Sequence, residues 1–220
     1  MKKILYQVLV ALGLLLVLLS MSGCSSKQPM TPLSEKELKA ANQWFSEMVI
    51  TGDKISTSEI SCFFTCYYSD PREIELSSFL AYCPVGEILE DADTEEFLEC
   101  MAAAQWPDPD GMYQKPSDFI LPVRRLPNAA VSAILMQYAG ITTADVKSFS
   151  GTVYLEEYDS FYNFTSDYAP GYFQCVGGET DGSQVRFWSE TTAEGTRDVL
   201  TLQLENEQYL ICSFLPESLN

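Results

Sequence analysis

The sequence predicts an α+β fold in which N-terminal helices and one strand pack on a C-terminal antiparallel β-meander. Three observations predict it. Apolar residues recur at helical spacing in several segments of residues 35–140, and capping signals and turns separate these segments. From Val153 onward, apolar and polar residues alternate in short runs around turn residues. A series of helices followed by a series of strands is typical of α+β proteins, so we expect a single domain over residues 34–220.

Four helices are predicted. The first begins after Ser34, where Ser34 and Glu37 form a capping box, and its apolar spacing continues over about 35–49 with Met48 on the core face. The other three are a short helix over 76–82, a helix led by Asp93 that continues to Ala104, and a helix that begins at Pro127–Asn128 and ends at Gly140.

Two strands are predicted from composition. Ile60–Tyr68 is rich in β-branched and aromatic residues and is followed by Asp70–Pro71, which favours a strand with Cys62 and Cys66 on one face, too far apart to bond. Tyr154–Tyr158 begins the C-terminal strands.

Two β-hairpins are predicted after these strands. Asp181-Gly182 is typical of a two-residue type I′ turn, which would place Val176 opposite Phe187. The second hairpin would join 199–204 to 209–214 through a three-residue loop at 206–208. With that loop, alternate residues of both strands meet on one apolar face: Leu200, Leu202, Leu204, Leu210, Cys212 and Phe214. This order of elements resembles the small cone of NTF2-like proteins, which implies an architecture and no function.

The N-terminus predicts a secretory signal peptide over residues 1–23. Lys2 and Lys3 precede an apolar run from Val8 to Leu19, and small residues follow it. The run is shorter than the ~20 residues that a membrane-spanning helix needs, which disfavours a transmembrane anchor.

Met21-Ser22-Gly23-Cys24 resembles the lipobox of bacterial lipoproteins. The resemblance implies that Cys24 is the lipid-modified first residue of the mature chain, with acyl chains such as palmitate that hold it at the extracytoplasmic face of the cell membrane. Residues 24–33 would form a polar tether. The chain also resembles uncharacterised lipoproteins of anaerobic Gram-positive bacteria over residues 59–71 and 162–171, a family to which no activity is assigned.

The acidic composition excludes several partners. The formal net charge is −18, and removal of residues 1–23 with their two lysines makes it about −20. Such a chain repels nucleic acid, anionic headgroups and anionic wall polymers, and suits cationic partners or Ca²⁺. Solubility at an exposed surface is the alternative reason for this charge.

Missing residue types exclude several chemistries. Histidine is absent, which removes Ser-His-Asp and Cys-His catalysis and histidine-ligated zinc. Glycine-rich phosphate-binding motifs are absent too. We therefore expect no enzyme, no cofactor and no metal site. Outside the cytoplasm the remaining six cysteines permit disulfides, and fifteen complete pairings are open: Cys62, Cys66, Cys83, Cys100, Cys175 and Cys212.

Three function classes stay open. The first is a surface-tethered binding or interaction module for a glycan, a peptide or an envelope protein. The second is a carboxylate-based glycan hydrolase, for which Glu157 and Asp159 would share one face of a strand. The third is an accessory subunit of an envelope complex. A small-ligand module should show a concave, aromatic-walled pocket, whereas an accessory subunit should show an exposed apolar patch on an acidic surface.

Residues 154–173 are dense in aromatic and acidic side chains and provide the candidate ligand site. Amphipathic tyrosines next to acids in a loop-rich stretch are typical of ligand contacts. The predicted ligand-binding residues are Tyr158, Tyr162, Tyr168, Glu157, Asp159 and Asp167.

Overall fold

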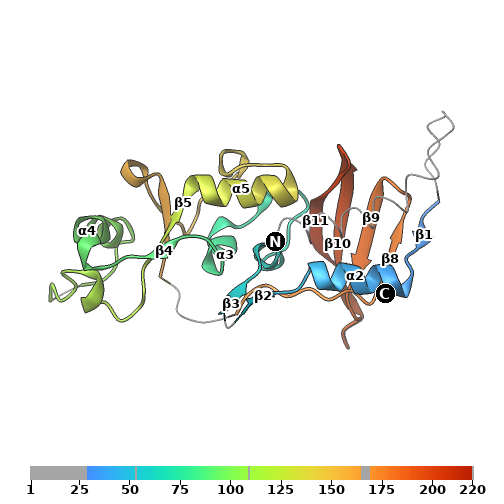
Figure 1. Ribbon diagram of the computed structural model, residues 1–220, viewed down its shortest axis with the longest axis horizontal. Helices are drawn as coiled ribbons and strands as arrows, with labels where there is room; N and C mark the ends of the chain where they lie inside the picture. The colour runs from blue at the N-terminus through green and yellow to red at the C-terminus, as the bar shows by residue number, and fades with distance from the viewer. Residues whose placement is uncertain (1–28, 53, 109, 165–168, 220) are drawn as a thin grey trace. The chain divides into compact units, whose positions relative to one another are not determined.

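The computed structural model describes residues 29–219 except 53, 109 and 165–168, and Cys24 with residues 1–28 lies outside them. Helices and antiparallel sheets occur together, which confirms the α+β class. The chain divides into two compact units (Figure 1). Unit 1 contains the chain up to Ser46, Tyr67–Pro71 and Tyr172–Asn220, and unit 2 contains Glu47–Cys66 and Arg72–Gly171. Residues 34–220, which the sequence predicts as one domain, are distributed over both units.

Unit 1 is built on a five-stranded antiparallel sheet. Its strand order is β1-β8-β9-β10-β11, an uninterrupted meander from β8 onward. The strands are β1 (Thr31–Pro32), β8 (Gly177–Thr180), β9 (Gln184–Trp188), β10 (Thr196–Glu205) and β11 (Gln208–Ser218). The predicted tether over residues 24–33 is therefore shorter than expected, because Thr31 and Pro32 form β1, which pairs with β8.

Helix α2 (Glu35–Trp44) begins at the predicted capping box. The Ser34 backbone N–H donates to Glu37 Oε2 over 2.7 Å, and the Ser34 hydroxyl oxygen accepts from the Glu37 N–H over 3.4 Å. The helix ends at Trp44, so the prediction that it continues to residue 49 is wrong. Met48 lies in a strand instead and is not part of a helical core face.

The first predicted hairpin forms with a different register. Gly178, not Val176, lies opposite Phe187, and the loop from Asp181 to Gln184 is longer than the predicted turn. The Asp181 carboxylate accepts hydrogen bonds from the backbone N–H groups of Ser183 and Gln184, which stabilises the longer loop.

The second hairpin also differs from the prediction. Asn206 and Glu207, both at positive φ, form a two-residue turn between β10 and β11, and a β-bulge follows Thr201. The shorter turn places Ile211 opposite Leu202, so the prediction that Leu210 and Cys212 face the core is wrong and both are half-buried. The buried residues of these two strands are Val199, Leu200, Leu202, Tyr209, Ile211 and Phe214.

Unit 2 combines a four-stranded antiparallel sheet with three helices. The sheet order is β4-β5-β7-β6. The strands are β4 (Glu87–Ile88), β5 (Arg124–Pro127), β6 (Val153–Leu155) and β7 (Ser160–Asn163), and the helices are α3 (Leu76–Ala81), α4 (Thr94–Ala103) and α5 (Asn128–Ala139). Helix α5 ends at Gly140 with φ +67°, the left-handed conformation expected of a glycine at this position. A separate two-stranded sheet is formed by β2 (Met48–Thr51) and β3 (Lys54–Thr57).

One predicted strand is wrong and another is shorter than predicted. The predicted strand over Ile60–Tyr68 begins inside the 3₁₀ helix η2 (Glu59–Phe64), in which five consecutive residues are buried. A segment buried all round shows no alternation, so its composition does not distinguish a strand from a helix. Strand β6 ends at Leu155, and Glu156–Tyr158 forms the 3₁₀ helix η7.

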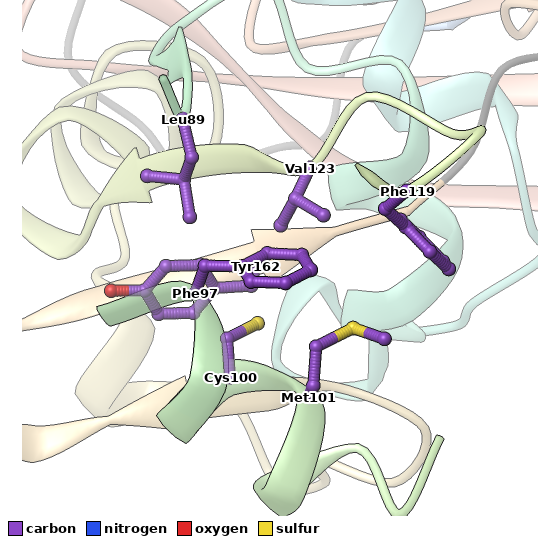
Figure 2. Close-up of a cluster of buried hydrophobic side chains, with 7 residues drawn as sticks. All are labelled: Leu89, Phe97, Cys100, Met101, Phe119, Val123 and Tyr162. Atoms are coloured by element: carbon purple, nitrogen blue, oxygen red, sulfur yellow. The ribbon is translucent and has the colours of Figure 1, made fainter. Parts of the chain in front are cut away.

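A cluster of apolar side chains joins α4 to the sheet of unit 2. Figure 2 shows Cys100 and Met101 projecting from α4 toward Leu89, Val123 and Tyr162. Phe97 and Phe119 complete the cluster, and Trp106 packs edge-on against the Phe119 ring. Tyr162, a predicted ligand residue, is therefore part of a hydrophobic core.

Gly86 packs closely against the backbone of β5. It has φ +92°, and a Cβ atom there would lie 2.1 Å from the backbone oxygen of Arg125. Gly111 has a similar φ of +61°, yet its nearest neighbour would be a flexible glutamine side chain at 3.7 Å. We expect Gly111→Ala to cost about 1 kcal/mol from the backbone conformation alone, and Gly86→Ala to cost at least twice as much in urea unfolding. Equal losses would contradict this packing.

Candidate functional site

The six predicted ligand residues do not form one site. Tyr168 and Asp167 lie outside the described residues. Glu157 lies in the 3₁₀ helix η7, and Asp159 follows it with a left-handed φ of +43°. The strand that would have placed these two carboxylates on one face is absent, so the geometric basis of the predicted hydrolase pair is wrong.

Asp159 closes the turn between β6 and β7. Its Oδ1 accepts hydrogen bonds from the Tyr154 hydroxyl at 2.7 Å and from Asn128 Nδ2 at 2.8 Å. These two bonds hold the pKa of Asp159 below its usual value. The Asp159 carbonyl oxygen also accepts from the Asn128 N–H at 2.9 Å, which connects the turn to the start of α5. The contacts of this carboxylate are those of a structural residue.

Tyr158 is half-buried next to several acidic side chains. Burial raises the pKa of its hydroxyl, and the charges of Glu99, Glu157, Glu95 and Glu96 raise it further. Tyr158 therefore lies in an acidic environment supplied mainly by α4.

Glu96 is the buried acid of unit 2, with only 4% of its surface exposed. Its Oε1 accepts a hydrogen bond from the Tyr162 hydroxyl at 2.5 Å, and its Oε2 accepts from Arg125 Nη1 at 2.5 Å. Arg125 also pairs with Glu87 and lies 3.7 Å from Asp93 Oδ1. Burial, followed by the bond to Glu96, raises the pKa of Tyr162 far above its usual value. Each carboxylate oxygen of Glu96 has a partner, which is the arrangement of a structural ion pair.

A shallow hollow of about 650 Å³ lies along α2 in unit 1. It is lined by Glu35, Leu38, Lys39, Asn42, Gln43, Ser46 and Gln174. The Asn42 amide is already engaged, because it donates to and accepts from the backbone of Cys175 over 2.8 Å in each direction. The hollow contains no aromatic wall and does not match the pocket that a glycan module should show.

The β2–β3 hairpin carries a different kind of surface. Ile50 and Ile55 are directly paired across the two strands and are 68% and 65% exposed. Met48, two residues before Ile50, shares their face, since side chains alternate along a strand. We call Met48, Ile50 and Ile55 the hairpin apolar face.

The sequence contains a signal for this hairpin that the predicted first helix conceals. Residues 49–51 and 55–57 are rich in β-branched side chains and lie on either side of Gly52-Asp53, which is a hairpin pattern. The helical spacing of apolar residues continues through Met48, so the first strand of the hairpin is taken for the end of the first helix. Glu96 carries a weaker signal: it lies four residues before Cys100, at the border of the apolar face of α4, whereas the exposed Glu95 and Glu99 lie on the other side.

Tyr162→Phe tests the structural role of the Glu96 network. Loss of the hydroxyl leaves the buried Oε1 of Glu96 without its hydrogen bond, and we expect a loss of about 1–3 kcal/mol in urea unfolding. Tyr154→Phe is the matched control, since it removes a hydroxyl bonded to the exposed carboxylate of Asp159, where water replaces the lost bond. An equal or smaller loss for Tyr162→Phe would show that Glu96 does not depend on this bond.

Comparison of the chain with family models, curated proteins and solved structures finds no match. Among the described residues there is no cluster of three or more acidic or cysteine side chains that could hold a metal ion. The helices of that part of the chain are also too short or too polar to cross a bilayer.

Proposed function

We propose that the protein is a lipid-anchored, extracytoplasmic interaction module that binds another envelope protein through the hairpin apolar face. The observation that supports it is the exposure of Ile50 and Ile55, a directly paired set of large apolar side chains on a strongly acidic chain. Exposed apolar patches rimmed by polar residues are typical of protein-binding surfaces. No step of this proposal requires catalysis or a cofactor.

The charge of the chain defines the chemistry of the partner. A net charge of −18 opposes docking on an anionic lipid surface and opposes close approach of a second copy. A partner with an apolar centre and a basic rim would match both the hairpin apolar face and the negative net charge of the chain. An accessory subunit of an envelope complex would use the same surface in a longer-lived contact. The NTF2-like architecture stays a prediction on which this function does not depend.

The predicted lipid anchor on Cys24 limits the distance between the protein and the membrane. Removal of residues 1–23 would leave acylated Cys24 seven residues before Thr31, where β1 joins the sheet of unit 1. An extended chain spans at most about 3.5 Å per residue, so this tether holds β1 within about 25 Å of its lipid. The module would therefore meet partners located at the membrane surface.

Substitution of the hairpin face tests the interaction. A photo-crosslinking amino acid at position 50 or 55, introduced in the producing bacterium, should give a discrete adduct with one envelope protein. With that partner purified, we expect Ile50→Ser/Ile55→Ser to weaken binding by at least about 10-fold, because each buried isoleucine contributes about 1.5–3 kcal/mol.

Ile120→Ser is the matched control. Ile120 is 88% exposed in the same unit but lies outside the hairpin. The photo-crosslinking amino acid at position 120 should give no adduct, and Ile120→Ser should not change the affinity for the partner. Adducts to lipid, adducts to a second copy, or equal weakening by Ile120→Ser would overturn the assignment of this surface.

Cys24→Ser tests the anchor separately. The lipobox resemblance implies that this change abolishes acylation, so the chain should lose incorporation of labelled palmitate and leave the membrane fraction. Ser25→Ala, one residue away, should change neither measurement. Membrane retention of Cys24→Ser without label would mean that another feature holds the chain at the membrane.

A further inference from the structure

Two cysteines that are distant in the sequence lie together in unit 2. Cys62 belongs to the 3₁₀ helix η2, and Cys83 follows α3 by two residues. The Cys62 and Cys83 thiols lie close enough to influence each other's ionisation, and both side chains are 0% exposed. The packing of η2 against α3 supports the contact independently, because the Phe63 ring lies edge-on against Phe79 with 5.1 Å between centroids.

The other described cysteines have different neighbours. Cys100 lies in the apolar cluster of α4, and the Cys66 thiol lies next to the backbone of Glu75. In unit 1, the Cys175 and Cys212 thiols are directed at the carbonyl oxygens of Leu38 and Leu210, at 3.9 Å and 3.7 Å. Of the fifteen pairings that the sequence leaves open, the fold therefore favours those that contain Cys62–Cys83.

We propose that Cys62 and Cys83 form a structural disulfide in the mature protein. The two thiols lose two protons and two electrons when the S–S bond forms. A thiol–disulfide oxidoreductase accepts these protons and electrons, and its own disulfide is reduced to a dithiol. Oxidation of the pair requires the extracytoplasmic location given under the proposed function, because disulfides form and persist outside the cytosol. The choice of partners rests on the burial of both thiols and on the packing of η2 against α3.

The burial of the pair determines when oxidation occurs. Because both side chains are fully enclosed in the folded chain, an oxidant reaches them before η2 and α3 have packed or after they open. In the packed state the contact with Cys62 lowers the pKa of Cys83, and the same contact raises the pKa of Cys62.

Peptide mapping of the full mature chain tests the pairing. The chain is isolated from membranes of the producing bacterium, denatured without reductant, alkylated with iodoacetamide and digested with a glutamate-specific protease. Cleavage after Glu87 separates Cys83 from Cys100, and the Cys66→Ser variant decides between Cys62 and Cys66. We expect one linked pair, Cys62–Cys83, that persists in Cys66→Ser and Cys100→Ser.

Thermal unfolding provides the second measurement. Dithiothreitol should lower the Tm of the wild-type and Cys100→Ser chains by about 5–10 °C, as expected for loss of a link that closes a loop of about 20 residues. The Cys62→Ala/Cys83→Ala chain should show no such shift. A linked pair other than Cys62–Cys83 would overturn the proposal.

The acylation state of Cys24 separates failure of the pairing from failure of the proposed location. Alkylated Cys62 and Cys83 in a chain with acylated Cys24 would overturn the disulfide, since that chain has been exported. If Cys24 carries no lipid, the purified chain is refolded with oxidised and reduced glutathione. Formation of Cys62–Cys83 alone then supports the pairing without the location, and its absence ends the proposal.

Discussion

A buried carboxylate needs partners for both of its oxygen atoms, and in unit 2 this requirement fixes one helix against two strands. Glu96 comes from α4, Arg125 from β5 and Tyr162 from β7. Removing any of the three leaves a polar atom without its partner next to the aromatic cluster, which costs more than the bond itself contributes. The apolar cluster of Figure 2 supplies the burial on which unit 2 depends, and the Glu96 network selects one arrangement of it.

This constraint explains why the aromatic stretch from Tyr154 to Phe173 is not a single binding platform. Tyr162 and Phe161 are buried, Tyr154 and Asp159 stabilise a turn, and Tyr158 lies half-buried beside the acids of α4. An antiparallel strand that packs against a helix needs large side chains on its inner face. Aromatic density in such a stretch therefore indicates a core before it indicates a ligand.

Short-range signals were predictable from the sequence and long-range ones were not. The capping box at Ser34 and the left-handed Gly140 depend on backbone groups within a few residues, so the sequence alone predicts them correctly. The conformation of Glu59–Phe64 depends on burial by distant segments, and its composition favours the wrong element. The two hairpin registers failed for a local reason of another kind, since the hydrogen bonds of the Asp181 side chain support a longer first loop and Asn206 and Glu207 form a shorter second one.

The β2–β3 hairpin presents the opposite situation from the buried network, because Ile50 and Ile55 keep about two thirds of their surface exposed. A two-stranded hairpin is marginally stable in water unless a further strand or a packed face supports it. Ile50 and Ile55 already contact each other across the strands, but most of their surface remains in water. A partner that covers this face would stabilise the hairpin and remove apolar surface from water in one step. The negative net charge of the chain would then favour a partner with a basic rim, so affinity and selectivity would arise from separate features.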